Sequence, residues 1–238
     1  MLARYYDLLA DWPRRLAREI PFLRRLLPGR RILVAGCGTG GHLPALLAAG
    51  YDVTGIDSDA SMVDVARARG EGRVHHLSIE RCSSLGSVFD AVLCLGNVLP
   101  GLSVRGQLEA ALAEIHAVLA PGGVFFTQNL NYDLRWRQKN RFFPLLSGRH
   151  GEEEIVLFKF ADYAGSHLDF HTVFLVRPDP AAAWEQTILT TRQRPVFRQD
   201  LENACRLAGF SRLESWGGYA GEPFDPNRSH DLLLAAWK

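Results

Sequence analysis

The chain has 238 residues, a formal net charge of +1, and 47% hydrophobic and 22% charged residues. This length suffices for one α/β domain with an elaboration, and the near-zero charge excludes a general electrostatic attraction to nucleic acid or anionic membranes. No apolar run is long enough to cross a membrane, and Arg4 and Asp7 interrupt the N-terminal apolar stretch, unlike a secretory signal.

In chain order, residues 2–27 have the pattern of one or two helices broken at Pro13 and Pro21, with arginines on the polar side. From residue 31 to residue 128 strands and helices alternate, which predicts a parallel sheet covered by helices on both faces. The predicted strands are 31–35, 52–56, 73–77, 89–95 and 123–128, and the predicted helices are 40–49, 59–69 and 105–120.

The pattern changes after Asn129. Three extended runs follow one another with turn signals and no helices between them, which predicts an antiparallel excursion from the sheet. We expect one domain over 1–238, with an N-terminal helical lid over 1–28 and an antiparallel insertion over 130–196 that caps the ligand site and selects the substrate. The extended runs are 152–161, 167–177 and 185–193, followed by a helix at 198–208 and strands at 211–217 and 231–237.

The four cysteines bear on the compartment. They are widely spaced and include no C-x-x-C pair, so reduced thiols in a cytoplasmic protein are expected rather than a disulfide framework. The oligomeric state is left open. The cysteines are Cys37, Cys82, Cys94 and Cys205.

A glycine-rich turn follows the first predicted strand. The apolar residues 32–35 lead into Gly36–Gly41, and the second strand ends in Asp57. Glycines let backbone N–H groups approach a ligand where a Cβ would collide, and an acid about twenty residues further on is placed to bind a ribose diol. The pattern predicts a crevice for an adenosine-containing cofactor. The turn also fits the dinucleotide pattern G-x-G-x-x-G, so it does not choose the cofactor by itself.

Three further segments resemble the class I S-adenosylmethionine (SAM)-dependent methyltransferases. Ser58–Arg67 resembles that family's helix start, Phe89–Leu99 its fourth strand, and Leu119–Phe126 the turn that opens its fifth strand. The resemblance covers residues 30–128 and implies SAM rather than NAD as the cofactor. It also implies an α/β, Rossmann-like, seven-stranded, mostly parallel sheet with a reversed C-terminal hairpin and an antiparallel β insertion as a cap.

The resemblance assigns a cofactor-binding role to residues in six segments. The glycine turn would lie under the methionine part of SAM, Asp57 would accept hydrogen bonds from both ribose hydroxyls, and Met62 would lie along the adenine. The alternatives are an ordinary strand-end or N-cap acid at Asp57 and ordinary core packing at Met62. The implied cofactor-binding residues are Tyr6, Arg15, Gly36, Cys37, Gly38, Thr39, Gly40, Asp57, Ser58, Met62, Ser78, Ile79, Glu80, Leu95, Gly96 and Asn97.

Two positions depart from the family pattern. Ser78 stands where the family usually has an acid that reads the adenine amino group, and Glu80 is displaced from that place, although Ile79 still matches as the apolar neighbour. Val34 replaces the acid that relatives commonly carry in the strand before the glycines. Both changes remove contacts to the cofactor without overturning the resemblance.

Two local segments are similar to the glycine and sarcosine N-methyltransferase branch. They are Gly96–Leu102, in which Gly101 replaces a usual histidine, and Gln128–Asp133. The similarity implies that Asn131 and Tyr132 line a pocket for a small substrate.

The N-terminal residues are similar to a helix that closes over SAM in the same branch. Tyr5, Tyr6 and Arg15 carry this similarity, with Arg15 (or Arg14) implied near the SAM carboxylate. The alternative for the two tyrosines is simple packing of the first helix.

The segment Arg135–Arg141 interleaves basic and aromatic residues. Such a segment suits RNA, through stacking and phosphate contacts, or an anionic group of a small substrate, because arginine binds carboxylates and phosphates bidentately. A solvated loop is the alternative for Arg137 and Lys139. The near-neutral chain favours the small anion over nucleic acid, with Arg135 as a substrate-binding residue.

These observations favour SAM-dependent methyl transfer to a small molecule, an amine carrying an anionic group. A neutral amine needs little acid–base help, so no catalytic side chain and no metal are expected. His167 and His171 have the spacing of one face of a strand and are interpreted as surface or packing residues. The alternatives are a SAM- or S-adenosylhomocysteine-binding protein without transferase activity, and an RNA or protein methyltransferase.

Overall fold

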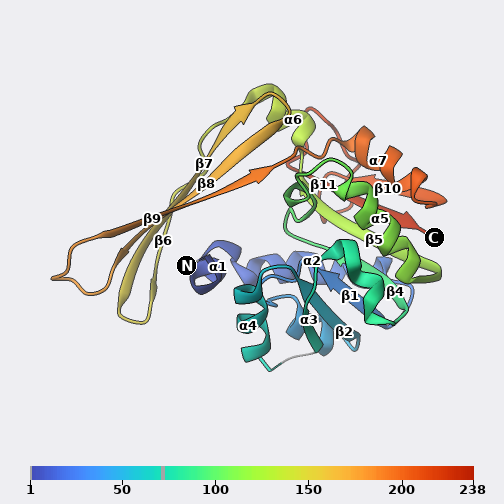
Figure 1. Cartoon of the computed structure of the whole chain (residues 1–238), viewed down its shortest axis with the longest axis horizontal. Helices are drawn as coiled ribbons and strands as arrows, with labels where there is room; N and C mark the ends of the chain where they lie inside the picture. Colours follow the sequence, from blue (N-terminus) through green and yellow to red (C-terminus); the bar gives the residue numbers. More distant parts are fainter. Residues whose placement is uncertain (1, 71–72) are drawn as a thin grey trace.

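The computed structural model describes residues 2–70 and 73–238, and a seven-stranded sheet forms its main body (Figure 1). The strand order is β10-β11-β5-β4-β1-β2-β3, with β11 antiparallel to both of its neighbours and the other pairs parallel. This confirms the predicted sheet and its reversed C-terminal hairpin. The strands are β1 (Arg31–Ala35), β2 (Asp52–Asp57), β3 (Arg73–His76), β4 (Phe89–Cys94), β5 (Leu119–Leu130), β10 (Arg212–Trp216) and β11 (Asp231–Trp237).

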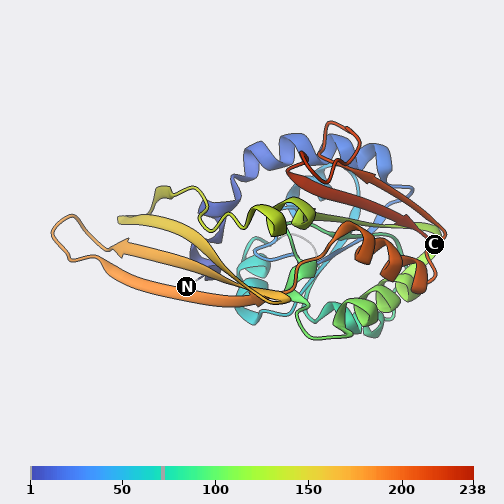
Figure 2. The same ribbon diagram turned by 90° about the horizontal axis from the view of Figure 1, so that it is seen from above.

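Helices cover both faces of this sheet because its strands bury apolar side chains on both sides. In β1, Leu33 and Ala35 join a core with α5 and α7, whereas Ile32 and Val34 join a core with α2, α3 and α4. Figure 2 shows α2 and α5 on opposite sides of the sheet. The helices are α1 (Leu2–Ala10), α2 (Trp12–Leu26), α3 (Leu43–Ala48), α4 (Ala60–Ala68), α5 (Gln107–Val118), α6 (Tyr132–Gln138) and α7 (Arg198–Leu207), with short 3₁₀ turns η1 (Ile79–Leu85) and η2 (Leu99–Gly101).

The inserted segment forms a second, four-stranded antiparallel sheet, hereafter the arm, in the order β6-β7-β8-β9. It projects from the main body beside α1 (Figure 1). One face is apolar and packs on α1, where Tyr5 meets Ile155, Leu157 and Phe174. The antiparallel insertion is confirmed, with one strand more than the three predicted. Its strands are β6 (Leu146–His150), β7 (Glu153–Ala164), β8 (His167–Arg177) and β9 (Glu185–Gln193).

The predicted break of the N-terminal helices was wrong at Pro21, and two short elements were not predicted. Pro21 does not break a helix but lies inside α2, whose buried Phe22 and Leu23 anchor it to the core. The break comes at Asp11, in the left-handed region at φ 42°, and Pro13 then occupies the first turn, where no backbone N–H is required. Helix α6, which begins after Asn131, and the short, mostly polar edge strand β6 were not predicted.

Across residues 2–70 and 73–238, no helix combines the length and the hydropathy needed to cross a membrane. Within the same ranges, no group of three or more His, Cys, Asp or Glu side chains is arranged to hold a metal ion.

Candidate functional site

The glycine-rich turn opens the site at the carboxyl end of β1. Gly36, Gly38 and Gly40 all have positive φ (73°, 56° and 79°), a conformation that side chains other than glycine adopt with strain. The backbone N–H groups of Gly36 and Cys37 both donate to the Ile56 carbonyl, at 2.8 and 2.9 Å. The turn is therefore bound to β2, and its position relative to Asp57 is fixed.

Asp57 lies at the end of β2 with its carboxylate held by the backbone. Gly38 N donates to Oδ2 at 2.8 Å and Asp59 N donates to Oδ1 at 2.9 Å. Because each carboxylate oxygen can accept a second hydrogen bond, the group stays available to a ligand in a fixed orientation. Asp59 in turn caps α4, accepting hydrogen bonds from Ser61 N and Met62 N.

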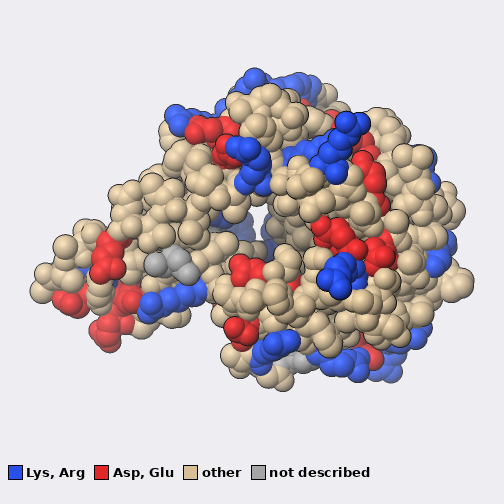
Figure 3. All heavy atoms as spheres, viewed as in Figure 1, with Lys and Arg blue, Asp and Glu red and all other residues tan. Residues whose placement is uncertain are grey.

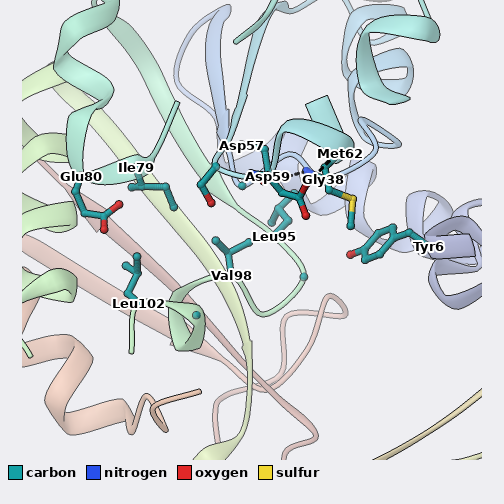
Figure 4. Close-up of a pocket in the computed structure, with 14 residues that line it drawn as sticks. Tyr6, Gly38, Asp57, Asp59, Met62, Ile79, Glu80, Leu95, Val98 and Leu102 are labelled. Atoms are coloured by element: carbon teal, nitrogen blue, oxygen red, sulfur yellow. Dashed lines mark hydrogen bonds between the residues drawn. The ribbon is translucent and has the colours of Figure 1, made fainter. Parts of the chain in front are cut away.

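A cleft of about 270 Å³, hereafter the first cleft, extends from these residues along the sheet edge. Figure 4 shows Tyr6 at one end, Glu80 at the other, and Asp57 and Leu95 between them. Its wall is polar beside Asp57 and apolar at Ile79, as a ribose next to a flat base requires. The cleft is lined by Tyr6, Gly36, Gly38, Asp57, Ser58, Asp59, Met62, Ile79, Glu80, Leu95, Gly96, Val98, Gly101 and Leu102.

Asp7 fastens α1 over this cleft. Its carboxylate accepts hydrogen bonds from the Thr39 hydroxyl at 2.8 Å and from Trp12 Nε1 at 2.7 Å, and it pairs with Arg69 beyond α4. These contacts join the N-terminal helices to the glycine turn and to the end of α4. They bring Tyr6 into the cleft.

Arg15 reaches the same region from α2, held by a buried cluster. Its Nε donates to Glu19 at 3.0 Å, and the other Glu19 oxygen contacts His42 Nε2 at 2.7 Å. The Glu19 and His42 side chains are only 3% and 4% exposed, and Arg15 also lies over the Trp12 ring at 5.0 Å. Helix α2 therefore carries a cation in a fixed position.

The ionisation of this cluster follows from its surroundings. Burial raises the pKa of Glu19, but the contacts with His42 and Arg15 outweigh it and leave that pKa below its usual range. Burial lowers the pKa of His42 by more than its contact with Glu19 raises it. The cluster is therefore an Arg15–Glu19 ion pair with a neutral histidine that donates from Nε2.

Acid is expected to loosen the N-terminal helices through this histidine. Because the folded pKa of His42 lies below the unfolded value of 6.5, its contribution is complete above pH 6.5 and is lost as the pH falls toward the folded pKa. One histidine gives a slope of at most about 1.4 kcal/mol per pH unit. Urea unfolding between pH 8 and pH 5 measures the slope. His42→Gln keeps an N–H donor but cannot titrate, so a slope below pH 6.5 as steep as that of the unaltered protein would contradict this assignment.

Tyr6 and Arg15 converge on Gly96, directly after β4. A Cβ built on Gly96 would lie 3.6 Å from Arg15 Nη2 and 3.8 Å from the Tyr6 hydroxyl, and one on Gly38 would lie 3.9 Å from the Tyr6 ring. Gly96 has φ 90°, and its N–H donates to Gln128 Oε1 at 2.8 Å. A cation and a hydroxyl thus approach the backbone of Gly96 closely at the sheet edge.

The predicted substrate residues lie on α6 or at its start. Asn131 is fully buried and caps the helix, and its amide donates to the Ser229 carbonyl at 2.8 Å. The Tyr132 hydroxyl accepts from Asn97 Nδ2 at 3.1 Å and donates to Gln193 Oε1 at 3.0 Å, and burial raises its pKa to about 12. These bonds tie the loop after β4 to α6 and to the arm.

The basic segment is partly engaged within the chain. Arg135 lies over the Phe143 ring at 4.9 Å, and Arg137 donates to Asn227 Oδ1 and to the Pro226 carbonyl, both at 2.7 Å. Arg137 is thus exposed, as the solvated alternative expects, but it lies on α6 and is bound to the loop before β11.

Most of the predicted cofactor-binding residues line the first cleft. Arg15 approaches it at Gly96, whereas Gly40 packs on Ala66 and the Cys37 thiol is buried, which raises its pKa to about 12. Outside the lining set are Arg15, Cys37, Thr39, Gly40, Ser78 and Asn97. The sequence analysis did not assign four further lining residues, namely Asp59, Val98, Gly101 and Leu102. Of these, Asp59 could have been found, because an acid directly before a helix is a typical N-cap.

Comparison with known proteins gives related chains. The family described as "Methyltransferase domain" matches residues 32–123. The glycine/sarcosine N-methyltransferase of Parasynechococcus marenigrum (strain WH8102) is 34% identical over 177 residues, covering 69% of this chain and 59% of that protein. The dTDP-3-amino-3,6-dideoxy-alpha-D-glucopyranose N,N-dimethyltransferase of Streptomyces fradiae is 34% identical over 129 residues, covering 52% of this chain and 51% of that protein. The chain thus spans between half and three fifths of the length of these relatives.

Solved structures show the same fold over nearly the whole chain. The sugar N-methyltransferase KedS8 from Streptoalloteichus sp ATCC 53650 superposes with a TM-score of 0.80 at 21% identity, covering 98% of this chain and 92% of that one. At this identity the likeness concerns the fold alone. It includes the arm as well as the main body, because so little of the chain lies outside the superposition.

Proposed function

We propose that this chain, which belongs to the class I SAM-dependent methyltransferases, transfers a methyl group from SAM to a small-molecule amine that carries an anionic group. By their names, one of the relatives described above acts on glycine or sarcosine and the other on an amino sugar nucleotide. Both kinds of acceptor are small amines. Their partial coverage makes the activity a proposal.

The residues of the first cleft fit SAM. Asp57 offers a free acceptor site on each oxygen to the ribose hydroxyls, and charged acceptors make stronger hydrogen bonds than neutral ones. Arg15 offers a cation to the methionine carboxylate, and Ile79 an apolar surface to the adenine. When bound, SAM supplies an electrophilic methyl group on a sulfonium sulfur.

The observation that carries the proposal is the convergence of Tyr6 and Arg15 on Gly96 at the edge of the first cleft. Because this residue has no side chain, the Arg15 guanidinium and the Tyr6 hydroxyl can approach the backbone there, 3.6 and 3.8 Å from the position of a Cβ. No side chain of the first cleft needs to exchange a proton with a neutral amine, so the chain would act mainly by orienting the two reactants. All four cysteines are buried free thiols, which supports a cytoplasmic location.

Transfer of a radiolabelled methyl group tests this function. We expect label to pass from SAM to members of an amine panel and not to carboxylic acids or phenols of similar size. Heat-denatured protein is the control. Tight binding of S-adenosylhomocysteine without transfer to any amine, acid or phenol would contradict the proposal and favour a SAM-binding protein without transferase activity.

A further inference from the structure

A second cleft of about 700 Å³ lies between α2 and the segment that joins β10 to β11. Figure 2 shows α2 running alongside this segment. The cleft is on the β5–β11 side of the sheet, whereas the first cleft follows β1, β2 and β4. The two clefts therefore divide the carboxyl edge of the sheet between them.

Two arginines of α2 form one wall of the second cleft. Arg14 and Arg18 are four residues apart, so they share one face of the helix, while Arg15 turns toward Gly96 instead. Over residues 2–70 and 73–238, neither Arg14 nor Arg18 forms an ion pair, in contrast to Arg15 with Glu19. Helix α2 thus directs Arg15, which is paired with Glu19, toward the first cleft, and Arg14 and Arg18, which can still bind an anion, toward the second.

The opposite wall contains a buried hydroxyl group without a partner. The Tyr219 hydroxyl is inaccessible to solvent and makes no hydrogen bond to any residue that the structure describes. Its ring is fixed edge-on against Phe22 at 5.6 Å. An unpaired buried hydroxyl is destabilising, and such groups in native proteins call for an explanation such as a ligand.

A short chain of hydrogen bonds connects the floor of the second cleft to the first. Asp231 lines the second cleft and accepts from Gln128 Nε2 at 3.1 Å, and Gln128 Oε1 accepts from Gly96 N at 2.8 Å. The Gln128 side chain therefore links Asp231, which lines the second cleft together with Glu222, to Gly96 of the first cleft. A compact molecule in the second cleft with an amine at one end would have that amine toward Asp231 and Gly96.

We propose that the second cleft binds the acceptor by its anionic group, on Arg14 and Arg18 and on the Tyr219 hydroxyl, with its amine, neutral when it accepts the methyl group, directed past Asp231 toward Gly96. This assignment rests on the proposed function and names the residues that select its substrate. The shared chemistry is a carboxylate or phosphate separated by a few bonds from an amine, because arginine pairs bind both anions.

Binding of matched probes to the complex with S-adenosylhomocysteine tests the assignment without requiring turnover. Glycine, β-alanine and phosphoethanolamine are each compared by calorimetry with a counterpart amine that lacks the anionic group, namely glycinamide, β-alaninamide and ethanolamine. We expect at least one anionic probe to bind at least tenfold more tightly than its counterpart, and the preferred anion distinguishes carboxylate from phosphate. Equal affinities, or no binding, for all three pairs would overturn the assignment.

The arginines are tested by the double variant Arg14→Gln/Arg18→Gln. We expect it to abolish the preference for the probe with an anionic group, a loss of tenfold or more, and to leave the affinity for the counterpart without that group and for S-adenosylhomocysteine unchanged. Arg24→Gln, at an exposed position of the same helix outside the cleft, is the matched control. A preference that survives in the double variant would overturn the role of Arg14 and Arg18.

Tyr219→Phe separates ligand binding from a structural role. Removing an unpaired buried hydroxyl should leave the unliganded protein as stable as before or more stable, while it weakens the anionic probe several-fold. A loss of stability with unchanged probe affinity would show that the hydroxyl serves the fold and not the ligand. If probe binding follows these expectations but no methyl transfer occurs, the proposed function fails while the binding site stands.

Discussion

Replacing Asp57 by alanine is expected to weaken the binding of S-adenosylhomocysteine by a factor of about 10² to 10³. The carboxylate would lose two charge-assisted hydrogen bonds to the ribose, each worth about 1.5–3 kcal/mol, and water recovers part of that loss. It would also release Gly38 N and Asp59 N, its present donors at 2.8 and 2.9 Å, so the glycine turn loses its support. Calorimetric titration measures the affinity.

Two variants show whether the effect belongs to this carboxylate. Asp64→Ala removes an exposed acid of α4 that is outside the first cleft and should leave the affinity unchanged. Asp57→Asn keeps the shape but offers one acceptor oxygen instead of two, so an intermediate loss is expected. Unaltered affinity in Asp57→Ala would mean that the glycine turn does not bind a nucleoside.

Glu19→Ala is expected to cost the largest amount of stability, about 3–5 kcal/mol, because it leaves the charge of the largely buried Arg15 without a partner. His42 Nε2 would lose its acceptor in the same substitution. The free energy of unfolding in urea measures the loss, and the affinity for S-adenosylhomocysteine should fall with it, since Arg15 would no longer be held beside Gly96.

Glu109→Ala is the matched control for this experiment. It removes an exposed glutamate from α5, and such surface changes alter stability by no more than about 0.5 kcal/mol. If Glu19→Ala cost no more than the control, the buried cluster would contribute nothing to the attachment of α2, and the acid sensitivity attributed to His42 would have to come from elsewhere.

Much of the fold was predictable because its signals are local. Strands β1 and β4 are short, mostly apolar runs between turn residues, and β11 was predicted with its observed bounds at 231–237. The error at Pro21 has a different origin. Helix propensity disfavours an internal proline, but the burial of Phe22 and Leu23 in the core, directly after Pro21, outweighs that preference.

The first cleft was predictable to the extent that its residues follow strands directly. Asp57 and Gly96 stand at strand ends, and parallel strands bring their carboxyl ends to one edge. The second cleft was not predictable, because Arg14 and Tyr219 are some two hundred positions apart and only the tertiary packing of α2 on the hairpin brings them together. No periodicity in the sequence records that contact.

The packing of α1 against both the glycine turn and the arm determines what can be exchanged between related chains. Asp7 contacts Thr39 on one side of this helix, while Tyr5 fits among Ile155 and Phe174 on the other. A chimera that transplants the arm alone would place foreign side chains against a native helix and leave gaps in that small core. The part of the chain that can be exchanged as a unit is therefore discontinuous and consists of residues 2–10 together with residues 146–193. Figure 3 shows the opening that this unit borders.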